Sequence, residues 1–463
     1  MSSNTSSLDQ NVFDPKAAAE QREQRKQKIQ SSLAKRHRKE KIFRWTGFSA
    51  VVIALAFVAL LFSSILSKGL PAFWQSSITV PVYFDPALID AGAKPQPREN
   101  ETPAHFEERM VEWQTSMGMV DWDALIVNGI IHQDPALANQ SDDIRSLYAS
   151  SEAYRLRDMV LEDPSLIGST QKLKFLADAN VDVWLSGKID RSLPDDQQQL
   201  SPEVRQAADQ LKADGVIQNT FNTNLFVNTD SRSSPATSGL AGAFMGSLFM
   251  MLIVILISIP IGVASAIYLE EFAPKNFLTD IIEVNINNLA AVPSIVFGLL
   301  GAAIFVGWMQ LPLSAPLVGG LVLSLMTLPT VIITTRAALK AVPPSIHQAA
   351  LGLGASKVQT IFHHVLPLAL PGILTGAIIG VAQALGETAP LLLIGMSAFV
   401  ANIPATPLDQ ATALPVQVYL WQGNELRNFF EGRTSAAIIV LLGLMIMLNG
   451  FAIWLRKKFE VRW

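Results

Sequence analysis

Six stretches of predominantly apolar residues alternate with polar segments along the 463-residue chain. Each stretch is about 20 to 30 residues long, and about 20 apolar residues suffice to cross the ~30 Å hydrocarbon core of a bilayer. The pattern therefore predicts an all-α polytopic membrane protein with six transmembrane helices. We expect the spans near residues 45–66, 239–268, 286–308, 314–335, 371–395 and 434–455.

The distribution of basic residues predicts how these spans are oriented. Residues 1–44 carry 11 Lys and Arg against 5 Asp and Glu, and the last span is followed by Arg456 and further basic residues in 457–463. The positive-inside rule then places both termini in the cytoplasm, the loop 340–370 inside and residues 67–238 outside. The first apolar run is too long for a cleaved signal peptide, so it is expected to remain as an anchor.

The outer segment 67–238 is long enough to form a domain, which we call the insert. It is acidic, with 25 Asp and Glu against 14 Lys and Arg in 68–235. Amphipathic patterns at 105–117 and 202–213 predict a helix-rich soluble fold, and the polar stretch 228–238 is typical of a linker. Docking, spacing and an ordered decoration all remain open as its role.

The composition excludes several classes of chemistry. The chain has no cysteine, so it has no disulfides, thiol catalysis or cysteine-based metal sites. His363 and His364 are neighbours on a predicted helix and point about 100° apart, so no metal site is expected from them. No stretch has the spacing of a phosphate-binding P-loop. We therefore expect no cofactor on this chain, no nucleic-acid partner and no ATPase activity of its own.

A short Ala- and Gly-rich segment between two spans, QAALGLGASKVQTIFHHVLP, suggests a docking element for a soluble partner. Gln348, Ala349 and Ala350 predict a thin helix whose backbone can enter a groove. Gly354 permits a turn without steric cost, and Pro367 is expected to end this element or begin the next span. The alternative is an amphipathic loop at the membrane interface.

The residues before this segment also carry a helix-start signal. Two prolines precede Ser345, and Ser345 and Gln348 have the spacing of a capping box. The sequence thus predicts that the docking helix begins with a side-chain cap at Ser345.

One carboxylate lies well inside a predicted span. Glu387 follows the start of the 371–395 span by about 15 residues, on the order of 22 Å into the bilayer. Burying it costs about 2.5–3.5 kcal/mol on insertion scales, so an ionisable group there suggests a function. A glutamate hydrogen-bonded between helices is the structural alternative. Thr388 and Gln383 would supply neutral hydrogen bonds beside it.

The spacing of the docking segment resembles the coupling loop of ABC-importer permeases, and LGETAPLLL around Glu387 resembles the PstA-type permeases of phosphate ABC importers. The resemblance is best over 239–456 and implies the six-helix permease fold in a bacterial inner membrane. It also implies a heterodimer with a second permease, two ABC ATPase subunits that carry ATP and Mg, and an extracytoplasmic phosphate-binding protein. In that family the coupling loop would contact the ATPase.

Three positions depart from the family pattern. Gln348 replaces a glutamate, His364 replaces an isoleucine, and Gln383 replaces an arginine that commonly precedes the motif glutamate by one turn. The cation needed beside Glu387 would then come from the partner permease or from Arg336, if the fourth span brings it close. Otherwise Arg336 would be an anchor at the membrane surface.

Other functions fit parts of the sequence. A permease for phosphonate, sulfate or molybdate is the nearest alternative. A membrane-anchored sensor or scaffold would explain the insert and the basic tail, which is expected to be disordered near its start and to touch anionic lipid. It would leave Glu387 and the docking segment unexplained.

Overall fold

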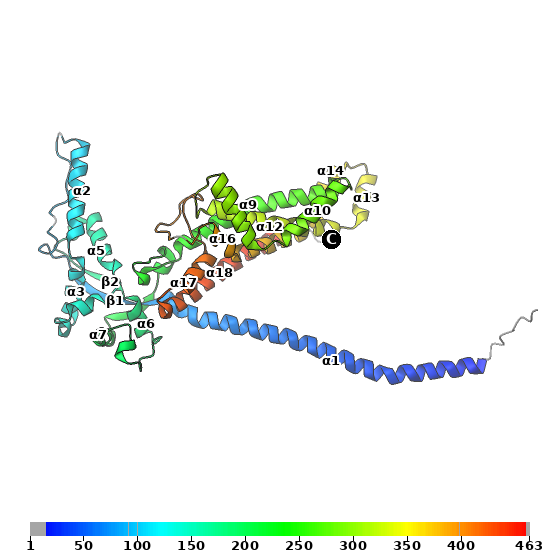
Figure 1. Cartoon of the computed structure of the whole chain (residues 1–463), viewed down its shortest axis with the longest axis horizontal. Helices are drawn as coiled ribbons and strands as arrows, with labels where there is room; N and C mark the ends of the chain where they lie inside the picture. The colour runs from blue at the N-terminus through cyan, green and yellow to red at the C-terminus, as the bar shows by residue number, and fades with distance from the viewer. Residues whose placement is uncertain (1–14, 91, 100, 398, 460–463) are drawn as a thin grey trace, which may run out of the picture. The chain divides into compact units, whose positions relative to one another are not determined.

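The computed structural model describes residues 15–90, 92–99, 101–397 and 399–459 (Figure 1). The chain divides into two units after Ser64, and each is described by itself. Helix α1 (Pro15–Gly69) begins in the first unit, within the basic tail, and runs on through the first predicted span, and its last five residues belong to the second unit. The predicted disorder near the start of the tail, and the end of the C-terminal segment at 460–463, lie outside the described residues.

The second unit contains the other predicted spans. Five helices of the described chain, α1 among them, are long and apolar enough to cross a membrane, and a bent pair of helices makes a sixth if it counts as one span. This agrees with the predicted all-α polytopic fold. The four long ones in this unit are α9 (Ala241–Ile267), α12 (Pro316–Lys340), α15 (Leu366–Gly386) and α18 (Arg427–Phe459).

The span predicted near 286–308 is not one straight helix, because it is broken near its start, at residues 291–293. Helix α10 (Phe277–Ala290) ends just before Pro293, and α11 (Ser294–Gly301) starts after it at an angle of 101° to α10. Proline lacks the N–H that would continue the helix and drives the preceding residue towards extended backbone, which explains the break. A π-helical turn, η7 (Ala302–Trp308), continues α11.

The predicted span 371–395 also ends early, at Gly386. Glu387 has extended backbone angles, φ −75° and ψ 130°, and a separate short helix, α16 (Ala389–Leu393), follows. The motif glutamate therefore lies in a helix break rather than inside a continuous helix.

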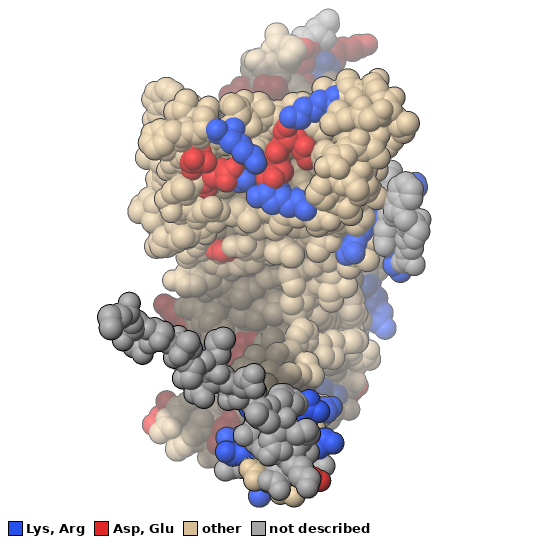
Figure 2. Space-filling model, turned by 90° about the vertical axis from the view of Figure 1, so that its right-hand side faces the viewer, with Lys and Arg blue, Asp and Glu red and all other residues tan. Residues whose placement is uncertain are grey.

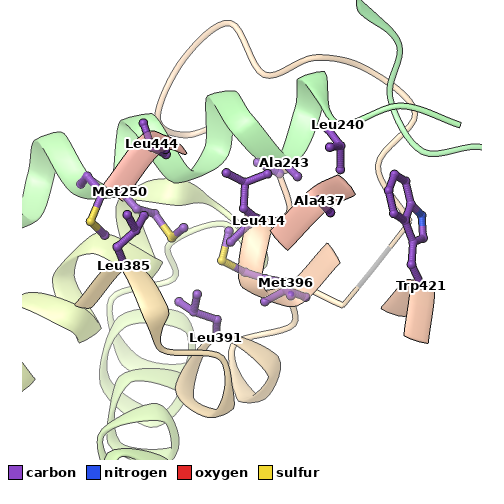
Figure 3. Close-up of a cluster of buried hydrophobic side chains, with 14 of the residues drawn as sticks. Leu240, Ala243, Met250, Leu385, Leu391, Met396, Leu414, Trp421, Ala437 and Leu444 are labelled. Atoms are coloured by element: carbon purple, nitrogen blue, oxygen red, sulfur yellow. The ribbon is translucent and has the colours of Figure 1, made fainter. Parts of the chain in front are cut away.

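Small residues allow the central helices α9, α12 and α15 to approach closely. A Cβ on Gly262 of α9 would lie 2.7 Å from a Val331 methyl carbon of α12, and a Cβ on Gly376 of α15 would overlap Thr334 of α12. This agrees with the role of small residues in membrane helix packing. Figure 3 shows the cluster where α9 and α15 meet α16, α17 (Leu414–Gln422) and α18, with Leu240, Met250, Leu385, Met396 and Trp421 among its members.

The insert contains a three-stranded antiparallel sheet that the sequence analysis did not predict. The strands are β1 (Trp74–Tyr83), β2 (Thr170–Leu176) and β3 (Ile217–Phe221), in the order β2-β1-β3. β3 pairs only with Trp74–Ile78, so among the described residues Pro81 lies where one side of β1 has no partner strand. Its missing N–H therefore costs no sheet hydrogen bond.

The described part of the insert contains seven helices besides this sheet, so the predicted helix-rich character of the insert is confirmed. Ile78, Val80 and Val82 of β1 are fully buried in a core that all of these helices except the last complete. The helices are α2 (Pro103–Met119), α3 (Trp122–Gln133), α4 (Ser141–Arg145), α5 (Ser151–Glu162), α6 (Ala179–Leu185), α7 (Pro202–Ala213) and α8 (Asn224–Val227).

A buried arginine joins the insert to the helix bundle. Arg433 of α18 is 3% exposed, and its guanidinium donates to Gln75 Oε1 of β1 at 2.7 Å, to Ala236 O at 2.9 Å and to Ser238 O. Its face also stacks on Phe429, 4.6 Å from the ring centre. One side chain thus holds the first strand, the linker and the last span together.

Candidate functional site

The predicted docking segment forms a short helix, a turn and a second helix. Helix α13 (Pro344–Gly352) carries Gln348 and Ala349 on its exposed side, whereas Ala350 is buried against the bundle. Gly354 has φ +89°, the left-handed region where glycine is favoured. Pro367 lies in the first turn of α15, as predicted for a residue that begins the next span.

The predicted cap at Ser345 is wrong. Helix α13 begins one residue earlier, at Pro344, with Pro343 as its N-cap and no side-chain hydrogen bond. Because proline is favoured in the first turn, the helix starts there and Ser345 is already inside it. A capping box forms one element later, where Ser356 and Gln359 start α14 (Lys357–Thr360).

Two leucines at the tip of this segment were not singled out from the sequence. Leu351 is 50% exposed and Leu353 is 91% exposed, next to the turn at Gly354. Large apolar side chains held outward at the end of a short helix provide the contact area that a protein interface needs. In the sequence, Leu353 stands between two glycines in a polar loop, and this pattern could have indicated an exposed apolar contact residue.

The docking segment is fixed to the bundle by charges and apolar contacts. His347 Nε2 of α13 lies 3.2 Å from both carboxylate oxygens of Glu271, in the turn η6 (Tyr268–Phe272) that continues α9. The Lys357 ammonium lies 5.4 Å from the centre of the Phe272 ring. Any displacement of α13 therefore acts directly on the end of α9. Residues from α9, α12, α15 and the turn η8 (Ile361–Val365) pack beneath it, including Ile267, Leu339, Val342 and Ile361.

His363 and His364 both lie in η8 and line a groove of about 560 Å³ between this turn and the end of α12. Pro343 and Pro367 line the same groove. Among the described residues no group of three His, Asp or Glu side chains could hold a metal ion.

Glu387 lies in the break between α15 and α16, with partly exposed Thr388 next to it. Gln383, one turn earlier, is exposed. Within the described residues the Glu387 carboxylate has no hydrogen bond or ion pair. The break itself is held in place because Pro390 of α16 packs directly on Gly298 of α11, where a Cβ would lie 2.6 Å from Pro390 Cα.

The structure does not bring Arg336 to Glu387. The guanidinium of Arg336 pairs with Glu270 Oε2 at 3.1 Å and with Glu283 Oε1 at 2.6 Å. Gly376 of α15 faces Thr334 of α12, so these two residues lie at the same height in the bundle. Arg336 is two residues beyond Thr334 towards the α13 end of the bundle, and Glu387 is eleven residues beyond Gly376 towards the other end. At 1.5 Å per residue the two are about 20 Å apart along the helices. Of the two predicted sources of the cation, Arg336 is therefore excluded in this conformation.

Arg336 instead belongs to a group of charges at the α13 end of the bundle. Lys340 Nζ adds a third contact, 3.5 Å from Glu270. Figure 2 looks onto this end and shows basic and acidic side chains intermixed on a surface that otherwise carries few charges. The two carboxylates come from η6 and α10, so Arg336 ties the end of α9 and the broken span to α12.

Two family models match the chain. Residues 258–461 match the binding-protein-dependent transport system inner membrane component family, and residues 30–195 match a domain of unknown function, DUF3333. The first match covers the helices that carry Glu387 and the docking segment. The second covers much of α1 and of the insert.

Individual relatives agree with the first match. The phosphate transport system permease protein PstA of Yersinia pestis is 32% identical over 237 residues, which cover 50% of this chain and 78% of that protein. The probable ABC transporter permease protein YqgI of Bacillus subtilis (strain 168) is 36% identical over 182 residues, covering 38% of this chain and 59% of that protein.

A solved structure titled as inward-facing conformations of the MetNI methionine ABC transporter aligns with a TM-score of 0.37. It is 16% identical, covering 47% of this chain and 94% of the other. A similarity this low adds no weight to the assignment. On the sequence matches, the chain belongs to the binding-protein-dependent transport system inner membrane components, as a PstA-type permease subunit of an ABC importer rather than an enzyme.

Proposed function

We propose that this chain is the permease subunit through which inorganic phosphate enters the cytoplasm, driven by ATP hydrolysis on separate subunits. The observation that carries the proposal is the unpaired carboxylate of Glu387, fixed in a helix break within the sequence that resembles phosphate permeases. The similarity to proteins named phosphate transport system permease supports the same substrate.

The proposed assembly pairs this chain with a second permease, two ABC ATPase subunits and an extracytoplasmic phosphate-binding protein. Both termini and α13 face the cytoplasm in this arrangement, and the insert faces outward. The basic residues at both ends of the chain support that orientation through the positive-inside rule.

Glu387 suits phosphate because of the proton that phosphate retains at neutral pH. A carboxylate accepts a hydrogen bond from protonated phosphate but has nothing to accept from fully deprotonated sulfate. Gln383, one turn before the break, and Thr388, directly after Glu387, add neutral hydrogen-bonding groups. An unpaired carboxylate also repels an anion, so the proposal requires a cation from the partner permease once Arg336 is excluded.

The direct test is uptake of radiolabelled phosphate in cells whose only high-affinity phosphate importer contains this chain. A hydrogen bond to a charged group contributes ~1.5–3 kcal/mol, so Glu387→Gln should lower uptake about tenfold to a hundredfold without loss of assembly. Sulfate should compete better in this variant, since an amide donates to either anion. The matched control is Glu431→Gln, because Glu431 makes an exposed pair with Lys68 at 2.7 Å. Full uptake by the Glu387 variant would refute the site, whereas transport of sulfate or phosphonate by the wild type would replace the substrate.

The proposed contact with the ATPase is tested separately. A charge at the 91% exposed Leu353 cannot be buried in an apolar groove without a large cost, so Leu353→Asp should separate the chain from its ATPase subunits. Leu193→Asp, on an exposed leucine of the insert, is the control. Co-purification of the ATPase with both variants in equal amounts would contradict a docking role for α13.

A further inference from the structure

A continuous aromatic surface is exposed where the insert meets the helix bundle. Trp74 and Phe221 are opposite each other at the open end of β1 and β3, with ring centres 5.8 Å apart. Phe226 stacks on Phe221 at 6.0 Å and on Phe73 at 5.7 Å. We call these four rings the aromatic ridge.

The side chains of the ridge are largely exposed rather than packed in a core. Trp74, Phe221 and Phe226 are 46%, 49% and 44% exposed, and the flanking Leu70 and Val227 are 47% and 63% exposed. The sheet face that buries Ile78 and Ile217 under helices thus continues uncovered at this end. Contiguous apolar surface of this kind marks an interaction site.

The two chain segments that build the ridge carry no charge at all. Neither 69–84 nor 216–229 contains Asp, Glu, Lys or Arg, although 68–235 contains 25 acidic and 14 basic residues. The two segments of the ridge are thus uncharged, whereas charged residues of the insert such as Lys188 and Asp230 contact the bundle at other points. An acidic domain beside an anionic or zwitterionic lipid surface needs such an uncharged contact face.

The packing of α18 places the ridge at the edge of the bilayer. Residues 434–455 of α18 are uncharged, about 33 Å long, and match the hydrocarbon thickness. Their boundary on the insert side is marked by Glu431 and Arg433. A Cβ on Gly69 would lie 2.8 Å from the Ser435 backbone, and one on Gly432 would lie 3.5 Å from Ala72 Cβ. The start of the ridge is therefore level with the first turn of the apolar run.

This level corresponds to the headgroup region, which extends about 5–7 Å beyond the hydrocarbon on each side. Tryptophan and other aromatic rings are enriched at that depth. The neighbouring surface is also open to lipid, because only 17% of the apolar window of α18 is buried, against 61% for α12.

We propose that the aromatic ridge inserts into the lipid headgroup layer on the insert side of the membrane and so rests the insert on the bilayer. Lipid, rather than a protein partner, is the occupant because the ridge continues the exposed apolar surface of a span. The inference does not depend on which substrate the permease transports.

The absence of cysteine makes a sharp test available. The substitution Phe226→Cys places a single cysteine in this chain, and that cysteine is spin-labelled. The full complex is then reconstituted into nanodiscs of phosphatidylethanolamine and phosphatidylglycerol. Collision of the label with oxygen reports lipid, and collision with a water-soluble nickel chelate reports water. Met119→Cys, on the 83% exposed end of α2, is the matched control, and a complex with the unchanged chain gives the background of the partner subunits.

The proposal predicts an oxygen-to-nickel collision ratio several-fold higher for the label at 226 than for the label at 119. A label at 226 that collides freely with nickel would show that the ridge faces water. A label that meets neither reagent would show that a protein subunit covers it. Either result would overturn the proposal, and a label at position 74 repeats the test on the other strand.

Discussion

Replacing Arg433 by methionine should loosen the insert from the bundle without unfolding either part. The side chain is buried and serves three acceptors, Gln75 Oε1, Ala236 O and Ser238 O. Methionine has similar length but no donor. Ala236 O keeps a second hydrogen bond, from Gln75 Nε2 at 3.1 Å. The loss of the Arg433 donor therefore affects Gln75 Oε1 and Ser238 O most.

The magnitude follows from those lost contacts. Each buried polar group left without its partner costs about 1–3 kcal/mol, and removing one member of a buried charged network costs about 3–5 kcal/mol. We therefore expect the free energy of opening this junction to fall by ~3–5 kcal/mol. Since 1.4 kcal/mol is a factor of ten, the open population should rise about a hundredfold to a few thousandfold.

Hydrogen exchange of the intact complex measures that population. The Leu240 amide donates to Leu225 O at 2.7 Å across the junction, so its exchange rate reports local opening. Arg433→Met should accelerate this amide, whereas Arg232→Met, at an exposed arginine over Phe399, should not. Acceleration below about threefold would mean that the network contributes less than 1 kcal/mol and would refute the reasoning.

Two further predictions concern packing and pH. Gly376→Val should destabilise the bundle by about 1–3 kcal/mol or more, because its Cβ would overlap Thr334, while Gly443→Ala, which has open space, should be neutral in thermal unfolding. Burial raises the pKa of the half-buried Asp178 carboxyl in the folded insert, although backbone N–H groups of α6 act against it. Its charge therefore costs folding free energy above that raised pKa, and the cost disappears as pH falls below the ordinary value. Asp178→Asn should stabilise the insert at pH 7 but not at about pH 3, because asparagine can still cap Asn180 N–H while carrying no charge. Equal unfolding temperatures of the variant and the wild type at pH 7 would contradict this.

The membrane spans were largely predictable from the sequence, because hydropathy over about 20 residues reports directly on transfer into lipid. The break at Pro293 was not recognised, since proline is tolerated in many membrane helices and only the neighbouring packing decides whether the helix bends. Similarly, the end of α15 at Gly386 depends on how Pro390 packs on Gly298, a contact between segments far apart in sequence.

The sheet of the insert was missed for a different reason. Ile78, Val80 and Val82 alternate with polar or exposed positions, which was a usable strand signal, but Pro81 interrupts it. Whether proline is tolerated depends on which side of β1 has a neighbouring strand, and that is a property of the fold. At the candidate site, Glu387 could be found from the sequence because it is a charge within an apolar run. The pairing of Arg336 with Glu270 and Glu283 could not be predicted, because it depends on how α12, η6 and α10 are arranged in space.

The pairing of Trp74 with Phe221 has a consequence for the ancestry of the permease. Opposite residues in antiparallel strands lie about 5 Å apart, so the chain leaves the membrane part and returns to it at nearly the same point. A segment with adjacent ends can be gained, lost or exchanged as one block while the flanking helices keep their spacing. The transport family match begins only at residue 258, after this segment. Residues 30–195, which include most of this segment, instead match the domain of unknown function. The adjacent ends of the segment allow its length and sequence to change while the chain still enters and leaves it at the same place.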